Sequence, residues 1–327
     1  MKKIFYGLFL LAPVVANAEV LDLDVALRAT YTACVGIDDE LADLKKMAGI
    51  NTAVTGVGTA LGVGATAVGI AKASKDAQAE AAAKTAKDAV EKAMEYTKDN
   101  VGRFKAPTQE QMDAFLAEFK RLGDEEWDKN VKPLRDESKK LGNWRTGLMA
   151  GNTATNIAGA IIAGNNKMDK DLETQIDDCR KAVVNLRDSV VRARIEGQDV
   201  AEATEIVSAC GEYEYVYVSK INSRAKGALI SSIVGATTGV AGTATSAVAN
   251  SDEIRNENRS GKNAEGEKKL DRTDAEWQKE KNWNTAANVL AGTSTVASGV
   301  ATVFNATQIS AIKKVANVAE KCTGVLK

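Results

Sequence analysis

The chain has 327 residues, of which 44% are hydrophobic and 27% charged, with 43 Lys and Arg against 44 Asp and Glu. This composition is apolar enough to form a core, and its balanced charge gives no overall field that would hold nucleic acid. The sequence has no histidine, which excludes His-based acid–base catalysis, Ser-His and Cys-His triads and imidazole metal sites.

The first eighteen residues predict a signal peptide. Lys2 and Lys3 precede a short apolar stretch, residues 4–15, and Ala16-Asn17-Ala18 supplies the small-x-small pattern of a cleavage site. The apolar stretch is shorter than the roughly 20 residues that a membrane-spanning helix needs. We therefore expect cleavage after Ala18 and export to the periplasm or the medium, with membrane association as an alternative.

The rest of the chain predicts helix almost throughout. Beyond residue 18 it contains only Pro107 and Pro133, and stretches such as residues 77–98 consist mainly of strong helix formers. Turns predicted at residues 102–107, 196–198 and 260–266 divide the chain into four helices. Residues 212–218 alternate like a strand, but a single strand would have no partner, so we expect this segment to be helical too.

An internal duplication is predicted from the order of rare residues. Cys34, Trp127, Trp144 and Cys179 recur in the same order as Cys210, Trp277, Trp283 and Cys322, and Met149-Ala150-Gly151 matches Leu290-Ala291-Gly292. We expect two helical hairpin repeats, residues 19–196 and 197–327, that pack together as one bundle.

The duplication also suggests how the four cysteines pair. In an oxidising compartment an even number of cysteines favours disulfides. Folding each half at its long turn brings Cys34 to Cys179 and Cys210 to Cys322, whereas the main rival joins Cys179 to Cys210 and Cys34 to Cys322. The predicted fold class is thus all-α, an elongated up-down four-helix bundle made of two tandem disulfide-closed helical hairpins. The cysteines lie too far apart in sequence for a typical zinc site, and we expect no metal and no cofactor.

Four stretches lack charged residues and are called the uncharged segments below. They are residues 47–71, 146–166, 227–251 and 282–312, with 25, 21, 25 and 31 residues. Because they begin and end at similar distances from the cysteines, they are expected to lie at one level of the bundle. A charged, coiled-coil-like extension, residues 72–140 and 252–281, would lie beyond them.

Glycines in these segments are predicted to mediate close helix packing. Gly58 and Gly62, like Gly235 and Gly239, have the small-xxx-small spacing that lets helix backbones approach closely. The pattern resembles the glycine-zipper segments of bacterial envelope and pore-associated proteins, which implies a relation to membranes but assigns no functional residue. The predicted packing residues are Gly58, Gly62, Gly64, Gly151, Gly235, Gly239, Gly242 and Gly292.

Two functions fit these patterns, and neither is catalytic. The first is an exported structural or interaction protein of the cell envelope or secreted fraction, with a protein partner or self-association and no nucleic acid. Its uncharged segments would form a close-packed soluble core, and Asn51, Asn152, Asn156 and Asn288 inside them favour this over membrane insertion. The alternative is a membrane-inserting or pore-forming protein, since 21 to 31 helical residues cover roughly 32 to 47 Å and a lipid hydrocarbon layer is about 30 Å thick. In that case Trp144 and Trp283 would act as interface anchors.

Overall fold

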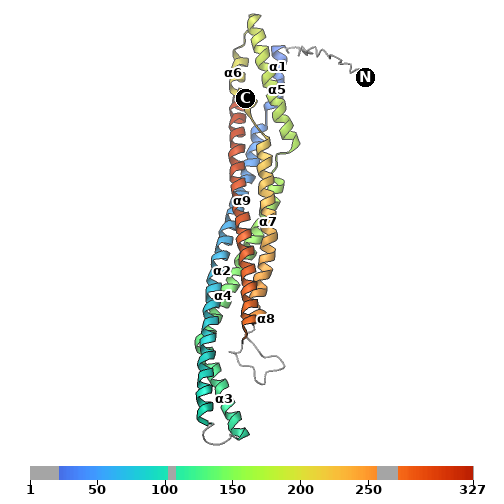
Figure 1. Cartoon of the computed structure of the whole chain (residues 1–327). Helices are drawn as coiled ribbons and strands as arrows, with labels where there is room; N and C mark the ends of the chain where they lie inside the picture. The colour runs from blue at the N-terminus through green and yellow to red at the C-terminus, as the bar shows by residue number, and fades with distance from the viewer. Residues whose placement is uncertain (1–21, 102–107, 256–271, 327) are drawn as a thin grey trace, which may run out of the picture. The chain divides into compact units, whose positions relative to one another are not determined.

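Every regular element in the described part of the chain is helical, which confirms the all-α prediction (Figure 1). The computed structural model describes residues 22–101, 108–255 and 272–326, so the predicted signal peptide and the predicted turns at 102–107 and 260–266 lie outside the described residues. The elements are α1 (Leu23–Cys34), α2 (Ile37–Val101), α3 (Gln109–Glu126), the π-helix η1 (Trp127–Val131), α4 (Lys132–Asn165), α5 (Lys170–Ile195), α6 (Ala201–Cys210), the 3-10 helix η2 (Gly211–Tyr215), α7 (Ser219–Ala249), α8 (Asp252–Arg255) and α9 (Asp274–Leu326).

Local chemistry explains several helix ends. Gly36, between α1 and α2, has a φ of 91°, and Gly197, after α5, has a φ of 77°. Glycine adopts this left-handed region without the steric penalty that a Cβ imposes. At the start of α3, the Gln111 amide N–H donates to Thr108 Oγ1 at 3.3 Å and the Thr108 amide N–H donates to Gln111 Oε1 at 3.0 Å, which forms a capping box.

The helices are more interrupted than the sequence predicts. Besides the break at residues 196–200, α1 is separated from α2 at Gly36, and α4 from α5 at residues 166–169. The prediction of helix over residues 212–218 is confirmed only for residues 212–215, which lie in the 3-10 helix η2, because the backbone is extended at Val216. Gly211 disfavours continuation of α6, and the tighter turn of η2 is accompanied by full burial of Tyr213 while Tyr215 stays 73% exposed. Tertiary packing thus decides the conformation here.

The chain divides into two compact units, each of which takes segments from both predicted repeats. Unit 1 comprises Met1–Ala42, Met168–Val218 and Lys313–Lys327, and unit 2 comprises Asp43–Lys167 and Ser219–Ile312. Helices α2 and α9 contribute residues to both units. The repeat boundaries, residues 19–196 and 197–327, stay a prediction.

Unit 1 contains both disulfides and a conventional apolar core. Cys34 is bonded to Cys179 and Cys210 to Cys322, with Cα–Cα distances of 4.8 and 4.5 Å, which confirms the predicted pairing and excludes the rival one. The Sγ atoms of Cys34, Cys179 and Cys322 lie within 4.8 Å of one another, so the two disulfides are neighbours. Large aliphatic side chains fill the core around them, among them Ile37, Leu41, Ile176, Leu186 and Ile206.

Unit 2 has a charged part with its own core. Trp127 of η1 and Trp277 of α9, which the predicted duplication aligns with each other, lie in one apolar cluster with Ala79, Ala83, Ala86, Val90, Phe119 and Val131. Beside this cluster, buried Glu280 accepts from Arg135 Nη1 at 2.8 Å and from Arg272 Nη2 at 2.6 Å. The Arg272 guanidinium also lies 4.0 Å from the centroid of the Trp277 ring. Ion pairing and cation–π stacking thus compensate for the loss of water around the buried charges of Glu280, Arg135 and Arg272.

Candidate functional site

The four uncharged segments lie mainly on α2, α4, α7 and α9, all within unit 2 (Figure 1). Side-chain hydrogen bonds join these helices. Asn51 Nδ2 of α2 donates to Asn305 Oδ1 of α9 at 2.9 Å. The hydroxyls of Thr146 on α4 and Ser246 on α7 lie 2.8 Å apart. These bonds join residues that are 100 or more positions apart in the sequence, so the site is assembled by the tertiary fold.

Hydrogen-bonded polar side chains form the interior of this site. Asn152 Nδ2 of α4 donates to Ser294 Oγ of α9 at 3.0 Å, and the Ser294 hydroxyl donates to the Gly235 carbonyl of α7 at 2.8 Å. One turn away, Asn156 Nδ2 donates to Ser298 Oγ at 2.8 Å. Asn152, Asn156, Ser294 and Ser298 are at most 1% exposed. Buried polar groups are costly unless paired, and this network pairs them across three helices.

Glycines bring the helix backbones close together around the network. A Cβ at Gly58 would lie 2.5 Å from Thr155 Oγ1, one at Gly235 would lie 2.7 Å from the Asn156 side chain, and one at Gly239 would lie 2.5 Å from Thr153 Oγ1. A Cβ at Gly62 would meet Thr295 of α9, and one at Gly242 would meet the Met149 methyl group. A larger residue at these positions requires the neighbouring side chain to move, and at Gly62, where Thr295 Cα would lie 3.1 Å from the Cβ, the backbone of α9 as well.

The other predicted packing glycines have more room. A Cβ at Gly151 would lie 3.1 Å from Leu61 Cδ1, and one at Gly64 would lie 3.5 Å from Leu148 Cδ1, which is an ordinary contact. At Gly292 no atom of the chain lies within 4 Å of the Cβ position. Gly292 is therefore at no helix crossing within the described chain.

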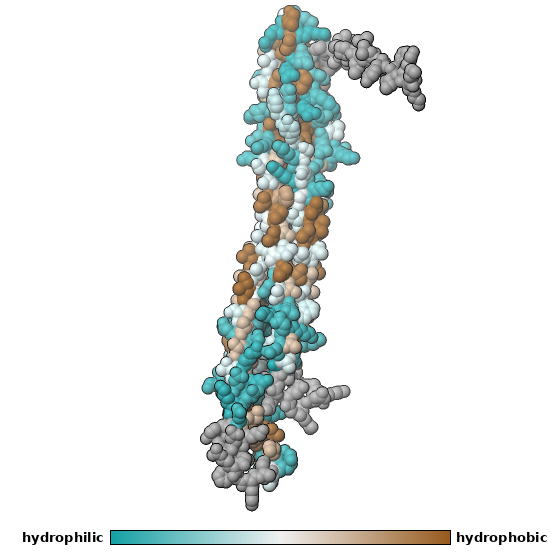
Figure 2. Space-filling view, in the orientation of Figure 1, coloured by the Kyte–Doolittle hydropathy of each residue, from teal (hydrophilic) through white to brown (hydrophobic). Residues whose placement is uncertain are grey.

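The large aliphatic side chains of the uncharged segments lie mainly on the outside. Among the described residues of these segments, Met149 and Ile312 are the only buried aliphatic side chains larger than alanine. Figure 2 shows hydrophobic patches over α7 and α9. The exposed members include Val57, Val63 and Ile70 of α2, Ile157 and Ile161 of α4, Ile230, Ile233, Val234, Val240 and Val248 of α7, and Val289, Val296, Val300 and Val303 of α9.

The two predicted interface anchors lie at the boundary between the charged part and the uncharged segments. Trp144 of α4 is 68% exposed and Trp283 of α9 is 37% exposed. Next to Trp144, the Arg145 side chain is fully buried and donates to Ser246 Oγ at 2.8 Å, Asn288 Oδ1 at 3.0 Å and Asn284 Oδ1 at 3.1 Å. The boundary thus combines exposed indole rings with an inward-facing guanidinium.

Asn51, Asn152 and Asn156 of the uncharged segments are buried and bonded to residues of α9. They weighed against a membrane role when each helix was considered alone, yet the structure places them between the helices. Their spacing carries this signal, because Asn152 and Asn156 are four residues apart, as are Ser294 and Ser298. Residues at i and i+4 share one face of a helix, so a polar stripe opposite an aliphatic one was detectable.

Three described helical stretches are long and apolar enough to cross a membrane, namely Leu23–Glu95, Ser219–Ala249 and Asp274–Leu326. Within their most apolar windows only 28%, 28% and 33% of the residues are buried. Comparison with protein-family models, curated proteins and solved structures finds no match to this chain. The functional argument therefore depends on the site itself.

Proposed function

We propose that this chain is a non-catalytic membrane-inserting protein whose uncharged segments form a four-helix bundle inside a lipid bilayer. The observation that supports it is the reversed polarity of these segments. Apart from Met149, Gln308 and Ile312, their buried residues are Asn, Ser, Thr, Gly and Ala, while their other Val and Ile side chains are partly or largely exposed. In water such a bundle would leave its main apolar surface unburied, whereas in lipid the same surface is solvated.

Unit 1 supplies an internal comparison. It belongs to the same polypeptide, and it buries Ile37, Leu41 and Leu186 completely, as a soluble helical domain does. The uncharged segments have aliphatic residues available and expose them. The two parts of the chain thus place their aliphatic side chains differently.

The interior suits a bilayer for the same reason. Helices in lipid gain little from burying aliphatic side chains against one another, because the surrounding lipid is equally apolar. They associate through close packing of small residues and through interhelical hydrogen bonds. The Gly62 crossing and the bond between Asn152 and Ser294 are contacts of these two kinds.

Length and flanking residues agree with this placement. Segments of 21 to 31 helical residues cover roughly 32 to 47 Å, against a hydrocarbon thickness of about 30 Å. Trp144 and Trp283 lie at one boundary, where indole rings favour the lipid headgroup region. The segments are rich in Gly, Thr and Asn, so each alone is weakly hydrophobic, which would let the chain pass an inner membrane during export and insert after assembly.

The proposal is an inserted bundle and not an open pore. The central polar side chains between the helices are hydrogen-bonded to one another and buried, because the Ser298 hydroxyl contacts the side-chain oxygens of both Asn152 and Asn156. Export, a location in the cell envelope and a structural or interaction role for the parts outside the lipid belong to the same proposal.

A matched pair of variants tests it. Val240, on α7 in the centre of its uncharged segment, is 56% exposed, and Val191, on α5 in unit 1, is 57% exposed. Lysine at either position should leave the fold intact. In a bilayer, a lysine near the midplane costs about 2.5–3.5 kcal/mol, so Val240→Lys should weaken lipid binding about 60- to 300-fold, whereas Val191→Lys should have little effect.

The measurement is co-flotation of the purified oxidised protein with phosphatidylcholine–phosphatidylglycerol vesicles, together with release of an entrapped dye. We expect the native chain and Val191→Lys to float with the vesicles, and Val240→Lys to remain at the bottom of the gradient. A native chain that stays lipid-free, or equal flotation of the two variants, would remove the proposal. Dye release would show an open pore in place of a closed bundle.

A further inference from the structure

One end of unit 2 carries a strong excess of positive charge. At this end the uncharged segments terminate at residues 47, 166, 227 and 312, and the charged residues that unit 2 has beyond them are six basic and one acidic. The basic residues, called the basic end below, are Lys45, Lys46, Lys167, Lys220, Arg224 and Lys226, and the acidic one is Asp43. Such an excess attracts an anionic partner.

Contacts with a single turn of α9 place these basic residues at one level of unit 2. The Asn51 side chain of α2 and the Asn166 carbonyl, which follows α4, both bond to residues 305–308 of α9 at 2.9 Å. The Arg224 guanidinium of α7 donates to a carbonyl of the same turn. In each case the nearest lysine lies one to five residues away along the sequence, or at most roughly 8 Å along a helix. The positive charges of three chain segments therefore meet at this end.

Most of these charges are free to meet a partner. Four of the lysines are exposed, namely Lys45, Lys46, Lys167 and Lys226. None of the four forms an ion pair with a carboxylate of the described chain. At the opposite end of the uncharged segments, by contrast, Lys139 lies 2.8 Å from the carboxylate of Asp252.

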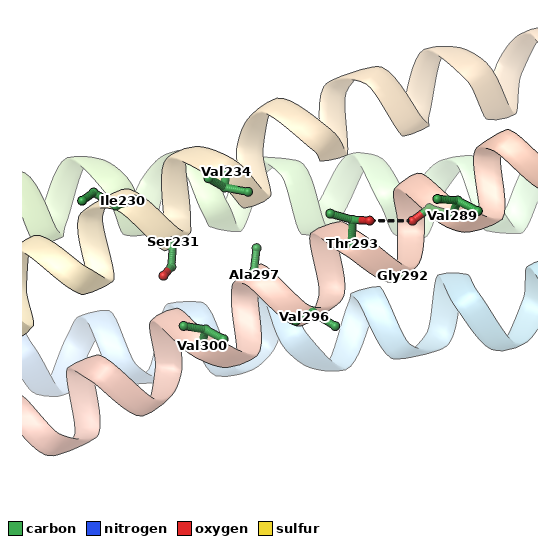
Figure 3. A pocket seen from close by; sticks show the side chains of 9 residues that line it. All are labelled: Ile230, Ser231, Val234, Val289, Gly292, Thr293, Val296, Ala297 and Val300. Atoms are coloured by element: carbon green, nitrogen blue, oxygen red, sulfur yellow. Dashed lines mark hydrogen bonds between the residues drawn. The ribbon is translucent and has the colours of Figure 1, made fainter.

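Exposed aliphatic side chains begin one helical turn from these lysines. Lys46 is followed on the same face of α2 by Ile50, which is 44% exposed, and Lys226 is followed on the same face of α7 by Ile230, which is 52% exposed. Ile230 lines an open groove of this aliphatic exterior together with Val300 of α9 (Figure 3). A cationic layer next to an aliphatic one matches the phosphate and hydrocarbon layers of a phospholipid leaflet, whereas a nucleic acid would use only the charges.

We propose that the basic end binds the headgroups of anionic phospholipids and lies in the headgroup layer when the uncharged segments are inserted. This rests on the proposed function and adds to it the class of lipid and the end of unit 2 that meets it. Lysine stems lie along apolar surface while their ammonium groups reach the phosphates. Each basic side chain near an anionic lipid surface strengthens binding about fivefold, and the effect falls off within a Debye length of about 8–10 Å.

Two fourfold variants that remove the same number of charges test the inference. The first combines Lys45→Gln, Lys46→Gln, Lys167→Gln and Lys226→Gln. The control combines Lys92→Gln, Lys120→Gln, Lys129→Gln and Lys132→Gln. The four control lysines are also exposed, and they lie at least 14 residues from the nearest uncharged segment, or roughly 20 Å along a helix.

The measurement is co-flotation of the full oxidised chain over a range of lipid concentrations, with phosphatidylcholine vesicles and with phosphatidylcholine–phosphatidylglycerol vesicles at low salt. We expect the native chain and the control variant to bind the phosphatidylglycerol vesicles at least about 100-fold more tightly, since several basic residues act together. The first variant should lose most of this preference. High salt should reduce the preference of the native chain by screening.

The outcomes separate this inference from the proposed function. Equal binding of the native chain to both kinds of vesicle, or an equal preference in the two fourfold variants, would overturn the inference and leave insertion standing. A preference that only the first variant loses, together with unchanged flotation of Val240→Lys, would keep the basic end as a lipid-binding surface and refute insertion.

Discussion

The close crossing of α2 and α9 at Gly62 can be tested with one pair of conservative substitutions. In Gly62→Ala the added Cβ would lie 3.0 Å from Asn152 Nδ2 and 3.1 Å from Thr295 Cα, and closer still to Thr295 Oγ1. The hydroxyl could rotate away, but the Thr295 Cα belongs to the backbone of α9. The substitution therefore forces the two helices apart.

Gly56→Ala provides the reference on the same helix. No atom lies within 4 Å of its Cβ position, so alanine should stabilise α2 there by about 1 kcal/mol through its higher helix propensity. The same propensity gain applies at Gly62 and cancels in the comparison. What remains is the overpacking penalty, about 1–3 kcal/mol. Gly62→Ala should therefore be less stable than Gly56→Ala by about 1–3 kcal/mol.

The assay is urea-induced unfolding followed by circular dichroism, supported by hydrogen–deuterium exchange of peptides from α2 and α9. We expect the two variants to differ in midpoint at equal slope, with faster exchange around residues 62 and 295 in Gly62→Ala only. Equal stability of the two variants would refute the close crossing, and with it the arrangement of the polar interior.

Two further predictions concern buried polar groups. Glu280→Gln should destabilise the protein by about 3–5 kcal/mol in the same unfolding assay, because it leaves Arg135 and Arg272 buried without the carboxylate that they contact. Glu118→Gln is the control, because Glu118 forms its ion pair with Arg121 at the exposed surface. A loss of stability in Glu280→Gln no larger than that in Glu118→Gln would contradict the buried ion pair. In unit 1, burial, aided by the charge of Asp38, raises the pKa of Tyr213 above its usual value of 10.0, so above pH 10 the unfolded state releases a proton that the folded state keeps. Stability should then fall by up to about 1.4 kcal/mol per pH unit, and Tyr213→Phe should remove that part of the slope; an unchanged slope in the variant would assign the effect to other groups.

Part of the candidate site was predictable from the sequence. The uncharged segments are visible as runs without Asp, Glu, Lys or Arg, and the small-xxx-small spacing at Gly58 and Gly62 points to close packing. Both are local patterns, and helical periodicity converts them into faces. The pairing of Cys34 with Cys179 followed from chain folding at a turn and the order of the repeats.

Other features were not predictable because they depend on which helix lies opposite. Gly292 has a similar local sequence to Gly151, each following a large apolar residue and an alanine. Leu61 nevertheless lies close to the Cβ position of Gly151, whereas no atom of the chain lies within 4 Å of that of Gly292. Tyr213 lies in a segment whose alternation allowed helix or strand, and burial selected a 3-10 turn. Such outcomes depend on contacts between residues far apart in the chain.

The sequence by itself determined that this protein is helical and that four segments carry no charge, and it favoured cysteine pairing within each half, because these properties follow from residue type and spacing along the chain. Only the tertiary structure decided which face of each segment points inward. The free energy of burying Asn152 depends on whether Ser294 is there to bond it, and that of exposing Val240 depends on the solvent that it meets. The residues next to Asn152 and Val240 in the sequence specify neither the position of Ser294 nor the solvent around Val240.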